Sequence, residues 1–105
     1  MYNYDFGNEK VIYESVENLI SINNKEGISN IIITKSKLLI FNNIKKNTIL
    51  SGRGIQEMPE YEILIELDLN KLSYEIDEEN TIIEFKDNEI ILYDFDLNKV
   101  KISLF

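Results

Sequence analysis

Two apolar runs separated by a short polar turn lie in the middle of the chain. Residues 31–33 are three consecutive isoleucines, residues 38–41 read Leu-Leu-Ile-Phe, and four polar or mixed positions separate them. Short apolar runs rich in β-branched residues and bounded by turn residues are typical of buried strands. The pattern therefore predicts a buried β-hairpin that turns at Lys35 and Ser36.

Alternating apolar and polar residues predict a strand before this hairpin. Residues 16–22 have a period of two, with Val16, Asn18, Ile20 and Ile22 on one face. Residues 23–27 are rich in Asn, Lys and Gly. Since Asn and Gly tolerate the positive φ of tight reversals, this segment is predicted to be a turn.

The clearest alternation covers residues 63–69 and continues over residues 72–76 with the opposite phase. A turn or bulge at Asn70 and Lys71 would restore the inward direction of the apolar side chains. The first segment places four apolar residues on one face: Ile63, Ile65, Leu67 and Leu69.

The last third of the chain predicts another hairpin and an ambiguous tail. Residues 81–86 and 89–95 flank Asp87 and Asn88, a favoured two-residue turn pair. Residues 96–105 fit one face of a helix, with Asp94 or Asp96 as a cap, and fit a strand equally well.

The segment between the two alternating regions contains most of the residues that break regular structure. Asn42 and Asn43 are a turn candidate, and residues 51–59 include two glycines and Pro59, the only proline. The sequence therefore predicts that residues 50–61 are mostly loop, the longest in the molecule.

Together these elements predict an all-β fold, a small antiparallel barrel or sandwich of about seven strands with at most a short C-terminal helix. The absence of Ala agrees with a chain poor in helix. We expect one domain over residues 1–105, with residues 1–8 as a lead-in. The predicted core comprises Ile33, Leu39, Phe41, Ile65, Leu67, Tyr74, Ile83 and Phe85.

Charge is distributed unevenly along this acidic chain, whose net charge is −8. Residues 27–53 contain five bases and no acid, whereas residues 54–105 contain fourteen acids and four bases. Such asymmetry either steers charged partners or reflects pairing of basic loops with acidic neighbours across the sheet. The five bases, here called the basic island, are Lys35, Lys37, Lys45, Lys46 and Arg53.

The composition argues against an enzyme. The chain contains no His and no Cys, which removes the commonest general base, the thiol nucleophile and any disulfide. We expect no catalytic residue, no cofactor and no metal. The first residues lack the basic start and apolar core of a signal peptide, so we expect a cytoplasmic protein.

Residues 9–13 and 31–41, with a Gly-containing turn between them, resemble the opening of bacterial PH-like and GRAM-like domains. In those domains a short strand precedes a hairpin whose turn follows a Thr and precedes a basic residue, and Lys37 stands here where an Arg is usual. The resemblance extends over residues 9–104. It implies two near-orthogonal antiparallel sheets of seven strands with a C-terminal capping helix, although residues 96–105 are short for that helix. It implies little about function, because such domains bind lipids, peptides or proteins.

The leading hypothesis from the sequence is a small non-catalytic interaction module that binds a protein or peptide. We expect its contact surface to include the predicted loop, because Arg, Met and Tyr are enriched at interfaces. Besides the basic island, that surface contains Met58 and Tyr61.

Two alternatives remain open. One is an acidic inhibitor of the phage or mobile-element type, which mimics nucleic acid and blocks a nucleic-acid-handling enzyme. The other is weak binding of anionic lipid through the basic island, although the surrounding negative charge makes membrane or nucleic acid binding unfavourable. The acidic face of the inhibitor would comprise Glu62, Glu66, Asp68, Glu75 and Asp77.

Overall fold

The computed structural model describes the backbone of residues 2–51 and 54–104, and the side chains of residues 2–42 and 60–104. In these ranges the chain forms eight strands and a C-terminal helix. The elements are β1 (Tyr2–Asn3), β2 (Tyr13–Ile22), β3 (Lys25–Ile33), β4 (Lys37–Ser51), β5 (Gly54–Asp68), β6 (Ser73–Asp77), β7 (Asn80–Phe85), β8 (Asn88–Leu92) and α1 (Leu97–Leu104).

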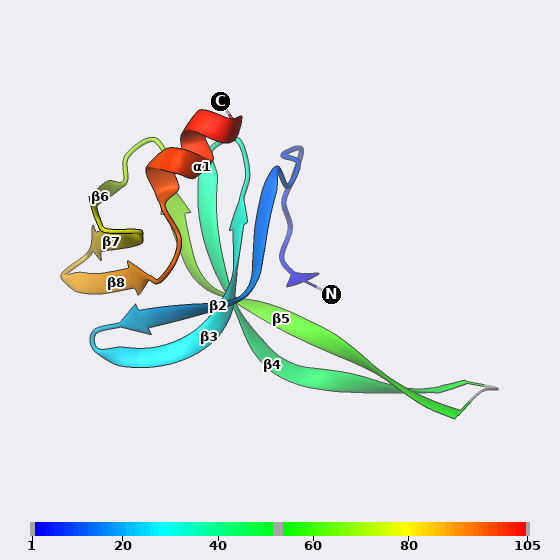
Figure 1. Ribbon diagram of the computed structural model, residues 1–105. Helices are drawn as coiled ribbons and strands as arrows, with labels where there is room; N and C mark the ends of the chain where they lie inside the picture. Colours follow the sequence, from blue (N-terminus) through cyan, green and yellow to red (C-terminus); the bar gives the residue numbers. More distant parts are fainter. Residues whose placement is uncertain (1, 52–53, 105) are drawn as a thin grey trace.

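All eight strands belong to one strongly bent sheet (Figure 1). Their order is β1-β5-β4-β3-β2-β8-β7-β6, and every neighbouring pair is antiparallel except β1 with β5. The predicted all-β fold with a short C-terminal helix is confirmed, although the sheet stays open and does not close into a barrel.

β2 joins the two halves of the sheet. On one side it pairs with β3, and at its C-terminal end it pairs with β8 through residues 20–22. The pairing with β3 shifts register between Ser15 and Asn18, where Glu17 has a φ of 53°. A bulge of this kind bends a strand. It also explains why Val16, predicted to face inward, is exposed.

The main core fills the concave side of the sheet. Alternate residues of β3 and β4, such as Ile31 and Ile40, point into it and are completely buried. The helix α1 covers one end of this core (Figure 1) and contributes Leu97. Burial of these apolar side chains is the main source of stability.

A second apolar cluster lies on the opposite face of the sheet. The N-terminal segment places Tyr2, Tyr4 and Phe6 against Phe41, with ring centroids 4.7, 5.8 and 6.2 Å from the ring of Phe41. Because this segment covers the back of the sheet, successive residues of β3 are buried on both faces. The buried members of this outer cluster are Ile32, Leu39 and Phe41.

The predicted core agrees with this arrangement. Five of its eight residues are fully buried, and the other three pack at the margin of the main core and are partly buried. The fully buried ones are Ile33, Leu39, Phe41, Leu67 and Ile83. The partly buried ones are Ile65, Tyr74 and Phe85.

The predicted turns occur close to their expected positions. The central hairpin turns between Ile33 and Lys37, as predicted, and the Thr34 N–H donates to the Lys37 carbonyl over 3.0 Å. The turn predicted over residues 23–27 is shorter, because only residues 23–24 have positive φ. The last hairpin turns at residues 86–87, one residue before the predicted pair.

The tail is helical. Asp96 accepts a hydrogen bond from the Lys99 N–H over 3.1 Å, as an N-cap residue does. Thr81, which is fully buried, accepts from the Leu97 N–H over 3.0 Å and donates to the Phe95 carbonyl over 2.5 Å. These bonds fix the start of α1 against β7.

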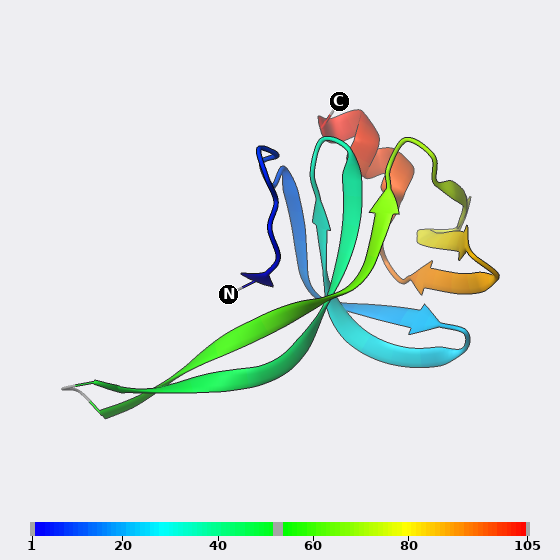
Figure 2. The ribbon, with the colours of Figure 1, turned by 180° about the vertical axis from the view of Figure 1, so that it is seen from behind.

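The described part of the segment predicted as a loop, residues 50–51 and 54–61, is instead strand. β4 continues through Asn42 and Asn43, where a turn was predicted, and Pro59 in β5 lies opposite Lys46. The part of β4 and β5 beyond Phe41 and Ile63, here called the arm, extends away from the rest of the molecule in both views (Figures 1 and 2). Proline is tolerated on edge strands such as these, which is why it failed to mark a loop.

Candidate functional site

β3 and β4 separate at the base of the arm. They pair only over residues 30–33 and 38–41; from there β4 continues with β5, while β3 continues with β2. We call this divergence the fork. Within the described residues, Lys25–Ser29 of β3 therefore has a strand partner on one side only.

A bulge in β5 marks the same place. Ile40 lies opposite Ile65 and Phe41 opposite Ile63, so Leu64 is an extra residue. Ile65 packs in the main core, whereas Ile63 packs in the outer cluster. The prediction that Ile63 shares a face with Ile65 was therefore wrong, because the bulge reverses the alternation. Leu64 itself is 46% exposed.

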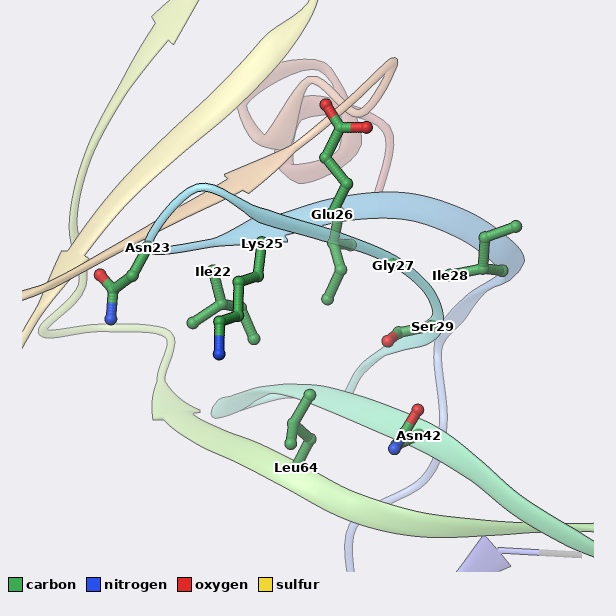
Figure 3. A pocket seen from close by; sticks show the side chains of 10 residues that line it. Ile22, Asn23, Lys25, Glu26, Gly27, Ile28, Ser29, Asn42 and Leu64 are labelled. Carbon is green, nitrogen blue, oxygen red and sulfur yellow. The ribbon is translucent and has the colours of Figure 1, made fainter.

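A groove of about 460 Å³ occupies the fork. The side chains of Ile22 and Lys25 point into it from the β2–β3 hairpin, and Leu64 points back from β5 (Figure 3). Glu26 and Ile28 point away from this space, so they border the groove with their backbone. The groove is therefore apolar at its centre and has an open strand along one wall.

The hydrogen-bonding direction of that wall follows from the turns. Thr34 donates its N–H to Lys37, so the even-numbered residues of β3 direct their backbone groups toward β4. The two-residue turn at residues 23–24, where φ is positive, leads to the same assignment. Such a turn closes on a hydrogen-bonded pair, here Ile22 and Lys25, so the odd-numbered residues of β3 direct their backbone groups toward β2. At Glu26 and Ile28 the backbone N–H and C=O thus face the groove, where β4 has already departed.

Gly27 leaves space in this groove. A Cβ atom built at Gly27 would have no heavy atom within 4 Å, and its φ lies outside the left-handed region. Gly27 lies opposite Ile20 in the β2–β3 ladder, so its missing side chain would point to the concave side. The fold itself does not require glycine here.

The basic island does not converge. Lys35 and Lys37 lie at the β3–β4 turn, whereas Lys45 and Lys46 lie on the arm opposite Glu60 and Pro59. Because β4 runs on without reversing, the two pairs are separated by eight or more strand residues, about 26 Å. The structure describes the backbone but not the side chains of Lys45, Lys46 and Met58. Arg53 lies outside the described residues.

Lys37 is engaged within the molecule. Its Nζ lies 3.0 Å from Glu66 and 3.3 Å from the Tyr4 hydroxyl, and the bond to Glu66 raises the pKa of Lys37. Tyr4 also donates to Glu66, and this bond, followed by that of Lys37, lowers the pKa of the Glu66 carboxyl. This partly exposed pair ties the N-terminal segment to the sheet and is not a free contact surface.

Lys35 instead borders a cavity of about 470 Å³ beside α1, together with Ser36, Leu69, Asn70 and Lys101. Lys101 belongs to α1 and is distant from Lys35 in the sequence, so the sequence does not indicate that the two residues border the same cavity. Lys101 also lies 4.9 Å from the ring centroid of Tyr74. The remaining predicted contact residue, Tyr61, is partly buried and stacks on Tyr2 with centroids 4.8 Å apart.

The predicted acidic face is divided. Glu66 and Asp68 lie at the C-terminal end of β5 on one face of the sheet. The bulge at Leu64 places Glu62 on the other face. Glu75 and Asp77 belong to β6, which five intervening strands separate from β5 in the sheet. Asp68 accepts the N–H of Asn70 over 2.9 Å in the following turn. The five carboxylates therefore do not form one row on adjacent strands.

No family model, curated protein or solved structure matches this chain. Among the described residues, there is no cluster of three or more potential metal-ligating side chains. Nor does the described part of the chain contain a helix long and apolar enough to cross a membrane.

The residues that line the fork were not predicted as a site from the sequence. The sequence predicts a strand at Ile22 and a turn at Gly27, and it assigns no role to Leu64. They come together where β4 departs from β3, a place at which β5 has its bulge at Leu64. Three consecutive apolar residues at positions 63–65 are the signal in the sequence, and their polar neighbours Glu62 and Glu66 conceal it.

Proposed function

We propose that this protein is a small non-catalytic interaction module of PH-like fold that binds a protein or peptide partner in the groove at the fork. The observation that carries the proposal is the coincidence of an unpaired strand edge with an apolar groove. Exposed edges are normally protected against pairing with other chains. Here the edge borders exposed Leu64 and the open space at Gly27.

Three further features support this proposal. Seven antiparallel strands followed by a helix that covers one end agree with the PH-like resemblance, although they form one bent sheet. The lack of His and Cys in the sequence supports a non-catalytic role. A chain without Cys also agrees with the cytoplasm as its compartment.

The test is a selection of binding peptides with a matched variant that fills the groove. The Gly27→Val variant adds a β-favouring side chain to the open space and should fold normally. We expect a displayed library of random twelve-residue peptides to yield sequences that bind the wild type and lose about tenfold or more on Gly27→Val.

Ile102→Ser is the control, because Ile102 is 82% exposed on α1, away from the fork. It should retain the selected peptides. Peptides that bind wild type and Gly27→Val equally, with both proteins melting at the same temperature, would refute the proposed site.

A further inference from the structure

We infer that the groove binds its partner as an added β-strand, hydrogen-bonded to the β3 edge, and that this strand is apolar with basic flanks. The inference rests on the proposed function, because it specifies how that same groove recognises a peptide. It concerns the backbone of β3, whereas the proposed function requires only that the groove be open.

The backbone of β3 presents the contacts that an added strand needs. Glu26 and Ile28 direct their N–H and C=O groups into the fork, about 7 Å apart, which is the spacing of two residues along a strand. An extended segment of about five residues would cover Lys25–Ser29. Main-chain bonds of this type supply affinity with little dependence on sequence.

The side chains on the two faces select the strand. On the concave side, an added strand would meet Ile22 and Leu64 in the groove. On the other side it would meet Ile28, which is 59% exposed and lies opposite Leu19, also exposed. Because each face of the fork has apolar side chains, Ile22 and Leu64 on one and Leu19 and Ile28 on the other, the central residues of the partner are expected to be apolar at successive positions.

Charge defines the flanks of the partner and argues against a second copy of this chain. Of the charged residues that line the groove, Lys25 is basic and Glu26 is acidic. Two more acidic residues adjoin lining residues: Glu62 lies opposite Asn42 in the β4–β5 ladder, and the Glu89 carbonyl accepts from the Asn23 N–H. Two copies, each of net charge −8, would repel one another. A segment flanked by Lys or Arg complements both the local and the overall charge.

The probe is a fluorescein-labelled nine-residue peptide with five β-branched apolar residues and two lysines at each end. We expect it to bind the wild type in fluorescence polarisation. The same peptide with glutamate flanks should bind at least about tenfold more weakly, because its charges repel the protein.

Two changes at Ile28 separate backbone from side-chain recognition. Ile28→Pro removes the N–H that faces the fork without removing a bond to β2, and proline is tolerated on edge strands. Ile28→Thr keeps this N–H and changes only the side chain. We expect a loss of about tenfold or more for Ile28→Pro and of less than about threefold for Ile28→Thr.

Two readouts remain informative if Ile28→Pro is destabilised. Binding should slow amide hydrogen exchange at Glu26 and Ile28, whereas Gly27, which faces β2, should exchange slowly in the free protein as well. A peptide N-methylated at alternate residues on its bonding edge should lose binding, and the isomer methylated on its other edge should retain it.

The outcomes distinguish the two proposals. Strand addition would be overturned if Gly27→Val loses binding while the amides of Glu26 and Ile28 gain no protection and Ile28→Pro and Ile28→Thr have equal effects. The groove would then remain the binding site. Binding that none of the three variants alters would overturn both. Protection of the same amides by self-association, detected by sedimentation, would overturn the basic peptide as the partner.

Discussion

Glu17 holds the bend of β2 in a conformation that residues other than Gly rarely adopt, with a φ of 53°. Its N–H leaves the ladder and donates to the Asn30 side-chain oxygen over 2.9 Å. The amide nitrogen of Asn30 donates in turn to the Tyr2 hydroxyl over 2.9 Å. Asn30 is 3% exposed, so this one side chain joins the bulge, β3 and the N-terminal segment.

We therefore predict that Asn30→Ala lowers the free energy of unfolding by about 1–3 kcal/mol, because it leaves a partly buried donor without an acceptor. Urea denaturation measures the change. Asn98→Ala, which removes an acceptor at an exposed site on α1, should cost less than about 0.5 kcal/mol. Equal costs at the two positions would contradict the role of Asn30.

Glu9 connects the lead-in to the central hairpin. Its carboxylate accepts bonds from the Ser36 hydroxyl over 2.5 Å, from the Ser36 N–H over 3.0 Å and from the Thr34 hydroxyl over 3.3 Å. The Ser36 hydroxyl contributes most to lowering the pKa of Glu9 below its ordinary value of 4.5. Folding thus favours the charged form of this carboxyl.

Because the pKa is lower in the folded state, the stabilisation from Glu9 is complete above the pKa of the unfolded chain. It is lost as the pH falls through the folded pKa. We predict that the wild type loses more stability than Glu9→Gln on acidification from about pH 5 to about pH 3. Urea denaturation across this range checks it, and parallel pH profiles for the two proteins would exclude the effect.

At the scale of elements, the N-terminal segment supplies a second layer. Of the three isoleucines of residues 31–33, the first and third face the main core and the second faces the outer cluster. All three are buried, because Tyr2, Tyr4 and Phe6 cover the outer cluster. Phe41, completely buried, is the centre of this layer and contacts all three rings.

Phe41→Ala should accordingly lower the free energy of unfolding by about 3–5 kcal/mol, through lost burial and the remaining cavity. Thermal and chemical denaturation measure this cost. For comparison, Ile102→Ala at an exposed position should change stability by less than about 0.5 kcal/mol. An unchanged melting temperature for Phe41→Ala would mean that the outer cluster is not a packed core.

How far the sequence predicts each element depends on whether the cause is local. The turn at Lys35 and Ser36 follows from adjacent residue types, and the five fully buried core residues follow from period and apolarity. Pro59 and the nearby glycines predict a loop where the arm forms strands. The prediction fails because proline is tolerated on edge strands. The fork is not predictable from the sequence, since alternation specifies neither the end of the β3–β4 pairing nor the register shifts at Glu17 and Leu64.

At the scale of the whole molecule, the arm accounts for the elongated shape. The principal extents are 50, 32 and 23 Å, and both ribbon views show the arm leaving the body as a two-stranded ladder (Figures 1 and 2). Beyond residue 45 of β4, the described backbone pairs only within the arm, β4 with β5. The body therefore contains the main core and all buried residues of the outer cluster.

We predict that the body folds without the outer arm. Replacing residues 46–59 by Asn-Gly places a favoured two-residue turn between Lys45 and Glu60, which already lie opposite one another. The melting temperature should change by less than about 4 °C, and the selected peptides should still bind. A drop of more than about 10 °C would show that the arm stabilises the body.

The short ladder between β2 and β8 has a consequence for biosynthesis. It joins Ile20–Ile22 to Ile90–Leu92, so the two ends of this contact leave the ribosome roughly seventy residues apart. At typical rates of translation, the nascent β2–β3 hairpin waits several seconds or more for its second neighbour. During that interval β2 is unpaired on one side and β3 is open at the fork, so the growing chain exposes two adjacent template edges. The negative charge of this chain lies mainly in residues 54–105, so it opposes association between nascent copies only after that part has been synthesised.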